Sequence, residues 1–240
     1  MKAYATIVAL LLAVAGGVRG VHAAELQPFV ASYAAFNAGK AVGSATMRVQ
    51  RSAPARWRID LDIAGNRGLA GIAGLDIAQS TVFEQAGDHY RPLSQSTRRK
   101  ALFFGRSSVG TYDWAAGIGH WTGDVKASRR QAVALQQGDM SGLLINLAIL
   151  RDAAPGKELH YRYVDGGRVR AHRYLVSSQA ENILVGELNY EALRVSRSNG
   201  GDDETIVWVA DGVPTPVRIL QRQDGRDGID LRLTAYQGVP

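Results

Sequence analysis

Short stretches that alternate apolar and polar residues recur along most of this chain, with turn-forming residues between them. In Trp57–Ile63 (WRIDLDI), apolar and charged residues alternate with the period of two expected of a strand that has one buried face. Asp165-Gly166-Gly167 separates two such stretches and is a strong hairpin signal. Further strands are predicted over 29–36, 41–50, 77–84, 89–97, 107–114, 118–122, 158–164, 168–176, 182–187, 190–197, 205–210, 216–223 and 229–236. Strands that recur about every eight to twelve residues favour a meandering antiparallel sheet over β-α-β units.

The segment Asp139–Asp152 (DMSGLLINLAILRD) departs from this pattern and is predicted to be a helix. Asp139 suits the N-cap position, and apolar side chains cover nearly all faces of the segment, which is typical of a buried helix. The segment is too short to cross a bilayer, which needs about 20 residues. We therefore expect a mainly β fold, in which a curved antiparallel sheet, half-barrel or barrel wraps around one central buried helix.

The N-terminus has the three parts of a cleavable secretory signal peptide. Met1-Lys2 gives a positively charged start, Ala5–Ala15 is an unbroken apolar run, and Val21-His22-Ala23 offers small or modest residues to a signal peptidase. The apolar run is too short to span a bilayer, although an uncleaved N-terminal anchor is the alternative. No cysteine follows the run, so a lipid anchor is excluded. We expect cleavage after Ala23 or Ala24, leaving a single soluble β-rich domain over 24–240 in the periplasm.

The expected mature chain carries little net charge and no cysteine. Without Lys2 and Arg19, 26 basic residues face 22 acidic ones, so the net charge is about +4. A nucleic-acid-binding protein usually has a denser basic stripe, and we expect no nucleic-acid partner. The absence of cysteine excludes disulfides, thiol nucleophiles and thiolate metal sites. We expect a monomer that is held together by its hydrophobic core.

No signature of catalysis or metal binding is complete in the sequence. Residues 105–110 (GRSSVG) lack the spacing of a G-x-S-x-G nucleophile elbow. His160 and His172 flank the predicted hairpin turn and are expected to lie opposite each other on one face. A third metal ligand is not evident, and Arg162 and Arg170 would share that face and repel a cation. We predict no catalytic residue, no metal site and no cofactor.

Four short motifs follow one another along the chain. They are Tyr33-x-x-Phe36-x-x-Gly39-x-x-x-Gly43, Ser80-x-x-Phe83-x-x-x-Gly87, Asp139-Met140-Ser141-Gly142-Leu143-Leu144, and Trp208-Val209-Ala210-Asp211 with Pro216-Val217. In this order they resemble the exported bacterial family known as domain of unknown function 3108, over nearly all of the mature chain. Members are similar in architecture to the periplasmic lipoprotein carriers, which implies an antiparallel half-barrel with an apolar cavity closed by helices. This chain departs from the carriers in having one clear helix, which leaves less cover for a cavity.

A glycine-rich connection between predicted strands is apolar enough to contact lipid. Gly65-x-x-Gly68-x-x-Gly71-x-x-Gly74 makes the chain flexible there and spaces the apolar residues apart. The residues that could contact a ligand are Leu69, Ile72 and Leu75. The segment either covers the end of the barrel and fills the core, or forms a mobile lip at a cavity mouth or a tip that enters a membrane.

A second such connection is the segment 98–106 (RRKALFFGR), in which cations surround an apolar centre. Basic residues attract anionic lipid, and aromatic side chains settle at the membrane interface. The candidate contact residues are Arg98, Arg99, Lys100, Leu102, Phe103 and Phe104. The alternative is a strand whose aromatic side chains enter the core while its arginines stay in water. Our hypothesis is that both connections mark the end of the barrel that meets the ligand or the membrane.

The function expected from these features is a non-catalytic periplasmic protein that binds or carries an amphiphilic or lipid-like ligand in cell-envelope biogenesis, with transient contact to a membrane surface. The alternative is a structural or adaptor protein of the envelope whose barrel is filled by its own side chains. A hydrolase is disfavoured by the missing nucleophile–base pair. A binder should co-purify with lipid, whereas an adaptor should be empty and should capture an envelope partner.

The signal peptide generates the first prediction. Expressed in a bacterium with its own N-terminus, the protein should appear in the periplasmic fraction with a new first residue, Ala24 or Glu25, because signal peptidase cleaves after small residues. N-terminal sequencing of the periplasmic protein measures this directly. An intact Met1 on the exported protein would contradict cleavage.

Overall fold

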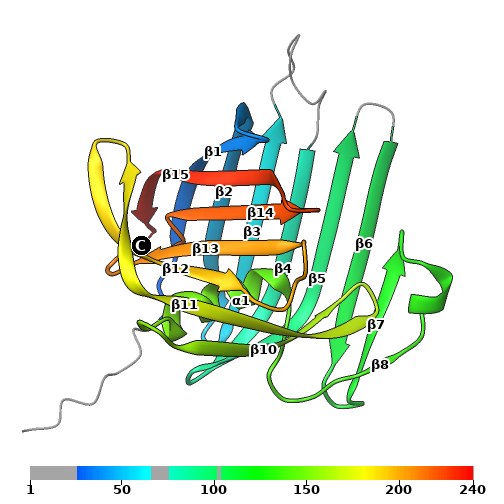
Figure 1. Ribbon diagram of the computed structural model, residues 1–240. Coiled ribbons are helices and arrows are strands. Elements are labelled where there is room, and N and C mark those ends of the chain that lie inside the picture. Colours follow the sequence, from blue (N-terminus) through cyan, green and yellow to red (C-terminus); the bar gives the residue numbers. More distant parts are fainter. Residues whose placement is uncertain (1–25, 66–75, 102–103, 240) are drawn as a thin grey trace, which may run out of the picture.

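The computed structural model describes residues 26–65, 76–101 and 104–239, which form one continuous fifteen-stranded sheet (Figure 1). The strands are β1 (Phe29–Asn37), β2 (Lys40–Ala53), β3 (Arg56–Gly65), β4 (Asp76–Ala86), β5 (His89–Ala101), β6 (Phe104–Asp113), β7 (Ile118–Gly123), β8 (Val133–Ala134), β9 (Asp139–Met140), β10 (Glu158–Asp165), β11 (Arg168–Val185), β12 (Leu188–Arg197), β13 (Glu204–Ala210), β14 (Arg218–Gln223) and β15 (Arg226–Gly238). A short 3₁₀ helix, η1 (Ala127–Arg129), and the helix α1 (Gly142–Asp152) complete the described elements.

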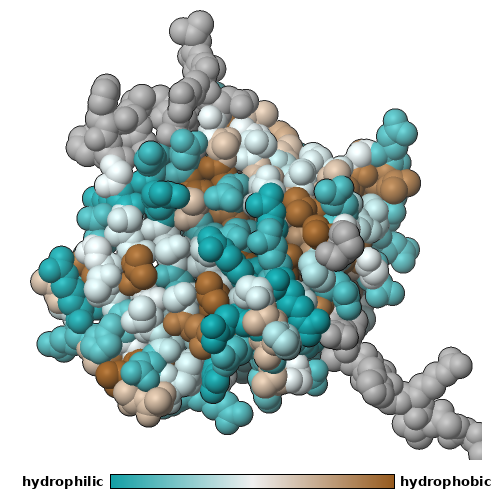
Figure 2. Space-filling model, turned by 180° about the vertical axis from the view of Figure 1, so that it is seen from behind, coloured by the Kyte–Doolittle hydropathy of each residue, from teal (hydrophilic) through white to brown (hydrophobic). Residues whose placement is uncertain are grey.

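The sheet is folded over on itself, so that its two halves face each other. Its strand order is β8-β7-β6-β5-β4-β3-β2-β1-β15-β14-β13-β12-β11-β10-β9, so the first and last long strands pair at its middle. Figure 1 shows β10–β15 running across β1–β6, with α1 between them. Seen from behind, the outer face of the β1–β6 half is largely hydrophilic, with small separate hydrophobic areas (Figure 2). The predicted fold, a curved antiparallel sheet wrapped around one central helix, is confirmed.

Register shifts at the junction of the two halves help the sheet to bend. The β1–β15 pairing shifts between Ser32 and Tyr33, and the β1–β2 pairing shifts between Ala35 and Phe36. A bulge of this kind inserts an extra residue on one strand, which bends the strand and increases its twist. The inward-facing residues of β1 are small or fully buried, as at Ala31 and Ala35, which lets α1 and the opposite half approach.

The helix α1 begins at Gly142, three residues after the predicted start. Ser141 is its N-cap and accepts a hydrogen bond from the backbone N–H of Leu144 at 3.4 Å. The prediction of Asp139 as N-cap is therefore wrong. Asp139 belongs to β9, which pairs in parallel with β10, and its carboxylate accepts hydrogen bonds from the Gln136 N–H at 2.8 Å and from Arg162 Nε at 2.5 Å. The pairing of β9 takes this residue away from the helix terminus.

Apolar side chains from both halves bury α1. Six helix residues are buried: Leu143, Leu144, Ile145, Leu147, Ala148 and Ile149. They belong to one hydrophobic core with Trp57, Ile59 and Phe83 from one half of the sheet and Ile206 and Val207 from the other. The Oγ1 of Thr81 on β4 lies 2.9 Å from Ser141 Oγ and ties the start of the helix to the sheet. In the described part of the chain, no helix has the length and apolar character needed to cross a membrane.

The strand predictions need one correction in the second half. The strands predicted over 168–176 and 182–187 are a single strand, β11, which continues through a register shift between Val176 and Ala180. A bulge of this type bends a strand without ending it, so polar residues in the middle do not mark a turn. The two-residue strands β8 and β9 were not predicted, because two residues are too few to show a period.

The burial of α1 generates the second prediction. Leu144→Ala should lower the free energy of unfolding by about 2–5 kcal/mol, because a fully buried leucine leaves a cavity when truncated. Leu188→Ala is the matched control, since that side chain is 63% exposed and should change stability by less than about 0.5 kcal/mol. Urea denaturation of both variants measures the difference. Equal stability of the two variants would contradict a packed helix between the sheet halves.

Candidate functional site

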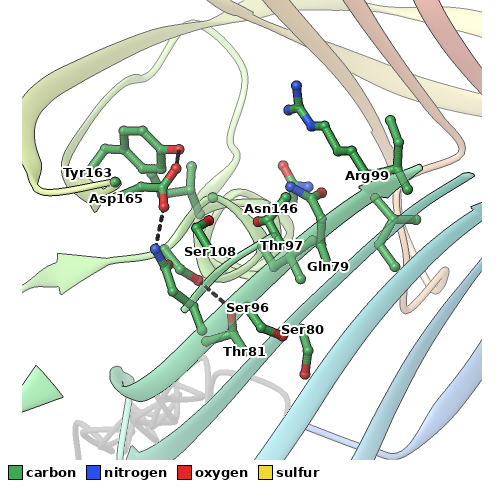
Figure 3. A pocket seen from close by; sticks show the side chains of 18 of the residues that line it. Gln79, Ser80, Thr81, Ser96, Thr97, Arg99, Ser108, Asn146, Tyr163 and Asp165 are labelled. Atoms are coloured by element: carbon green, nitrogen blue, oxygen red, sulfur yellow. Dashed lines mark hydrogen bonds between the residues drawn. The ribbon is translucent and has the colours of Figure 1, made fainter. Parts of the chain in front are cut away.

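A cavity of about 600 Å³ lies between the two halves of the sheet, beside α1 (Figure 3). Strands β3–β6 form one wall, and strands β10–β15 contribute to the other. The helix contributes Ser141, Leu143 and Asn146 to the lining. The segment around η1 adds Val125, Lys126 and Arg129. The cavity therefore takes its walls from segments far apart in the sequence.

The length of α1 explains why the interior is filled only in part. With 11 residues the helix is about 16 Å long, and as a layer it is about 10 Å thick. Two sheets that touch directly pack about 10 Å apart, so a helix between them roughly doubles the separation. Where the short helix does not extend between them, the two halves keep this separation. Their own side chains are too short to fill the gap there. The space that is left is the cavity.

The wall made by β4, β5 and β6 is polar on its inner face. The inward-facing residues there are Gln79, Thr81, Gln95, Thr97 and Ser108. Figure 3 shows Gln79, Thr97 and Asn146 gathered beside Arg99, with Tyr163 and Asp165 on the other side of the cavity. A strand that packs against a hydrophobic core carries apolar residues at its inward-facing positions, as β3 does. Gln79, Thr97 and Ser108 therefore face a space, whereas the buried Thr81 and Gln95 are hydrogen-bonded to Ser141 and Asp165 at its border.

Apolar residues of the lining come mainly from β3, β4, β14 and β15, which lie near the β1–β15 junction in the strand order, and from α1. They are Leu61, Ile63, Ile77, Leu143, Ile219, Ile229 and Leu231. The polar and charged residues come mainly from β5, β6 and β10–β12, which lie farther from the junction in the strand order. The cavity thus has an apolar end and a polar end.

Cations outnumber anions in the lining. The basic residues are Arg99, Arg106, Lys126, Arg129, Arg170 and Arg197, and the acidic ones are Asp124 and Asp165. Asp124 Oδ2 accepts a hydrogen bond from the Ser107 N–H at 2.6 Å. The lining therefore attracts negatively charged groups.

Asp165 belongs to a hydrogen-bond network that joins the two halves of the sheet. Its carboxylate accepts hydrogen bonds from the Tyr163 hydroxyl at 2.8 Å and from Gln95 Nε2. The single proton of the Tyr112 hydroxyl is shared between Gln95 Oε1 at 2.9 Å and the Val164 carbonyl at 2.8 Å. The network links β5 and β6 to β10 and places Gln95, Tyr163 and Asp165 in the lining of the polar end. Each oxygen of the Asp165 carboxylate thus accepts a hydrogen bond from a protein donor.

His172 is 92% buried in the polar end of the cavity, with an exposed fraction of 8%. Its ring stacks on Tyr163 with centroids 4.6 Å apart, and its Nδ1 lies 3.5 Å from the Tyr174 hydroxyl. Burial first, and then the positive charges of Arg197 and Arg170, lower the pKa of His172 from 6.5 to about 4. The imidazole is therefore neutral at pH 7.

The hairpin places His160 and His172 on opposite faces of the sheet, so the expectation of a shared face is wrong. His160 pairs with Arg173, and Tyr161 pairs with His172. The turn contains two residues, Gly166 and Gly167, both with positive φ, instead of the three that the sequence suggests. Changing the loop by one residue moves one strand by one position and so exchanges its two faces. Among the described residues, no three His, Asp or Glu side chains are grouped to hold a metal ion.

The cationic segment at the end of β5 is divided between the two faces of the sheet. Arg99 lines the cavity, whereas Arg98 and Lys100 lie on the other face. Successive side chains of a strand point to opposite faces of the sheet, so these three cations are divided between the faces. The hypothesis of one contact patch did not take this into account. Leu69, Ile72, Leu75, Leu102 and Phe103 lie outside the described residues, and Phe104 is placed as the first residue of β6.

Arg170, Arg197 and Gln95 are site residues that reasoning from the sequence did not identify. One local signal was present: residues 94–100 (SQSTRRK) are polar on both faces of a predicted strand. Such a strand is either at the edge of a sheet or beside a polar space. No comparable signal exists for Arg197, because its inward direction depends on its pairing with Tyr174 across β11 and β12.

Comparison with known proteins agrees with this fold. The family model described as "Protein of unknown function (DUF3108)" matches residues 29–233. The crystal structure of a β-barrel-like protein of domain of unknown function DUF1849 from Brucella abortus is similar, with a TM-score of 0.54 and 11% identity, over 90% of this chain and 99% of that chain. At this identity the likeness concerns the fold alone. No curated protein matches the sequence.

The environment of His172 generates the third prediction. In the unfolded chain its pKa is about 6.5, so the neutral buried ring contributes stability that is complete above pH 6.5 and is lost as the pH falls toward 4. The loss should reach a few kcal/mol, at about 1.4 kcal/mol for each pH unit. His172→Phe keeps the stacking on Tyr163 and removes the titration. The variant should therefore lose less stability than the wild type between pH 6.5 and 4.

Urea denaturation at several pH values compares the two proteins. The groups that face His172 are the phenols of Tyr163 and Tyr174 and the guanidinium groups of Arg170 and Arg197, with no carboxylate among them, so the difference isolates the imidazole. Identical pH profiles of wild type and variant would contradict a buried neutral His172.

Proposed function

Starting from the fact that this chain belongs to the DUF3108 family of proteins of unknown function, we propose that it is a non-catalytic periplasmic protein that binds or carries an amphiphilic, lipid-like ligand in cell-envelope biogenesis. The observation that carries this proposal is the cavity between the halves of the sheet. Its volume of about 600 Å³ falls within the range of small-molecule sites. An interior built only for stability would be filled to the density of a crystal.

The two ends of the cavity match the two parts of an amphiphile. Leu61, Ile63 and Ile77 on one wall and Ile229 and Leu231 on the other offer contacts to a hydrocarbon chain. Burial of apolar ligand surface contributes about 25 cal/mol per Å², so even a short chain held there gains binding free energy. The polar end supplies hydrogen-bond donors and positive charge for a head group. A purely apolar or purely polar ligand would leave one end unmatched.

Periplasmic location is the part of the proposal that rests on the sequence. The first 23 residues have the charge, the apolar run and the cleavage site of a secretory signal. The envelope is rich in amphiphiles that need a protein to cross water, and a cavity within a folded sheet shields a hydrocarbon chain from it.

The alternative function, an adaptor with a self-filled barrel, has one observation in its favour. Large side chains fill the interior around the helix, and Trp57, Phe83, Leu144 and Ile149 are almost completely buried there. This filling accounts for the stability of the fold. It does not account for the polar residues that face the cavity, since an adaptor needs no internal space. The carrier proposal accounts for both regions.

Blocking the cavity generates the fourth prediction. Thr97→Trp places a large side chain in the cavity, because Thr97 points into it from β5 (Figure 3). We expect binding of a fluorescent amphiphile, dansyl-undecanoic acid, to weaken by about tenfold or more, since overlap with the ligand costs at least 1.4 kcal/mol. Fluorescence titration measures the affinity. Mass spectrometry of lipids extracted from the purified periplasmic protein measures occupancy.

Thr111→Trp is the matched control, because Thr111 is exposed on the outer face of the neighbouring strand β6. This variant should bind the fluorescent probe as the wild type does. Loss of binding in both variants would point to a surface effect. Unchanged binding in Thr97→Trp, or a wild-type protein that binds no probe and yields no lipid, would reject the cavity as the binding site.

A further inference from the structure

Three side chains that face the cavity form a compact basic group at its polar end. Arg170 and His172 are two positions apart on β11 and so lie on the same face. Arg197 on β12 pairs with Tyr174, the next inward residue of β11, and lies diagonally across from His172. The positive charges of Arg197 and Arg170 both lower the pKa of His172, in agreement with this placement. We call Arg170, His172 and Arg197 the basic cluster.

Two members of the basic cluster carry buried polar atoms without a partner. Four buried side-chain atoms in the described residues form no hydrogen bond, and two of them are His172 Nε2 and Arg197 Nε. When His172 Nδ1 accepts a hydrogen bond from the Tyr174 hydroxyl, the neutral ring carries its proton on Nε2. Both atoms are then donors without an acceptor. Buried donors normally have a hydrogen-bond acceptor. Two donors without an acceptor at one end of a cavity therefore indicate that a ligand supplies it.

The charge of the basic cluster is also unbalanced. Within the described residues, neither Arg170 nor Arg197 forms an ion pair. Asp165, the acidic residue of β10 in the cavity, already accepts hydrogen bonds from Tyr163 and Gln95. The exposed Arg170 and the half-buried Arg197 both act on the His172 ring, and an anion held beside that ring would offset their positive charge.

The geometry points to the basic cluster as the binding site for a phosphate group at the head of the amphiphile, an inference that rests on the proposed function. A phosphate has several oxygens and a charge of up to −2, so it can accept from Arg170, His172 and Arg197 together. The guanidinium group suits such oxyanions because its N–H donors form a planar fork. The hydrocarbon chain would then extend toward Leu61 and Ile229, at the apolar end of the cavity.

The turn at Gly166-Gly167 brings further positive charge to this end. A Cβ on Gly167 would lie 1.9 Å from the Arg129 carbonyl oxygen, so only glycine lets η1 pack against the turn. This contact holds Lys126 and Arg129 in the lining beside the basic cluster. The two cations raise the positive potential around the proposed phosphate site.

Two amphiphiles that differ only in the phosphate test the inference. Lauroyl lysophosphatidic acid and monolauroylglycerol share the same acyl chain and glycerol, and only the first carries a phosphate. Inorganic phosphate is the third probe and separates a lipid head group from a free anion. Isothermal titration calorimetry on the mature protein should show lauroyl lysophosphatidic acid binding about 10- to 100-fold more tightly than monolauroylglycerol, the range expected for charged hydrogen bonds.

Variants of the basic cluster test which residues supply this preference. Arg170→Gln/Arg197→Gln should reduce the ratio of the two affinities to near one, while the affinity for monolauroylglycerol stays within about threefold of the wild-type value, because the apolar end is unchanged. Arg173→Gln is the matched control, since Arg173 lies on the outer face of β11. It should keep the wild-type ratio. Circular dichroism checks that each variant is folded.

A measurement on the wild type keeps the test decisive if the double variant fails to fold. Lauroyl lysophosphatidic acid should raise the pKa of His172, observed by NMR titration of the imidazole, because a nearby anion favours the charged ring. Monolauroylglycerol should leave the pKa unchanged. No change of the His172 titration with either lipid would overturn the assignment of the phosphate to the basic cluster.

The outcomes separate this inference from the proposed function. Equal affinity for both lipids in the wild type rejects the phosphate site and leaves the amphiphile binder in place. Inorganic phosphate that binds as tightly as lauroyl lysophosphatidic acid, with no binding of monolauroylglycerol, supports the anion site and rejects the amphiphile. Absence of binding of all three probes rejects both proposals.

Discussion

The packing of a short helix inside a single folded sheet is the constraint on which the structure depends. The helix α1 is apolar on nearly every face, so it must be buried on all sides, and both halves of the sheet are needed to do this. Because a helix is a layer in its own right, it sets the separation of the halves. Where the helix is present the interior is a hydrophobic core, and where it is absent the same separation leaves a cavity. The hydrophobic core and the cavity therefore have one geometric origin.

The polar network at the far end of the cavity follows from the same separation. Here β5 and β6 are joined to β10 by the polar side chains of Gln95, Asp165 and Tyr112, next to a small apolar cluster of Tyr112, Trp121 and Val164. A network of this kind is stabilising only when its members are satisfied, and these hydrogen bonds satisfy the Asp165 carboxylate. The neighbouring basic cluster is not satisfied in this way. This difference separates the structural tie around Asp165 from the proposed ligand site at the basic cluster.

Local patterns in the sequence were enough to predict most strands, the central helix and the curved sheet. Period-two alternation in Trp57–Ile63 and the apolar run in α1 depend on neighbours in the chain, so they can be recognised without the fold. The candidate site depends on contacts between distant residues, such as Gln95 with Asp165, 70 positions apart. The His172 error shows the limit most clearly. A one-residue difference in the length of a turn decides which face a whole strand presents, and the sequence Asp165-Gly166-Gly167 is compatible with either length.

The four motifs on which the resemblance to the family rests have structural roles in this fold. A Cβ on Gly43 would lie 2.0 Å from the Ala64 carbonyl oxygen, so glycine is required where β2 meets β3. The buried hydroxyl of Tyr33 donates to the Pro216 carbonyl at 3.0 Å and connects β1 to the chain that enters β14. Ser141 caps α1. Arg170, His172 and Arg197 lie outside all of these motifs. The residues that set the fold and the residues proposed to choose the ligand are therefore separate sets. Substitution at the basic cluster can thus change the proposed head-group preference while the helix and the two halves of the sheet keep the cavity open.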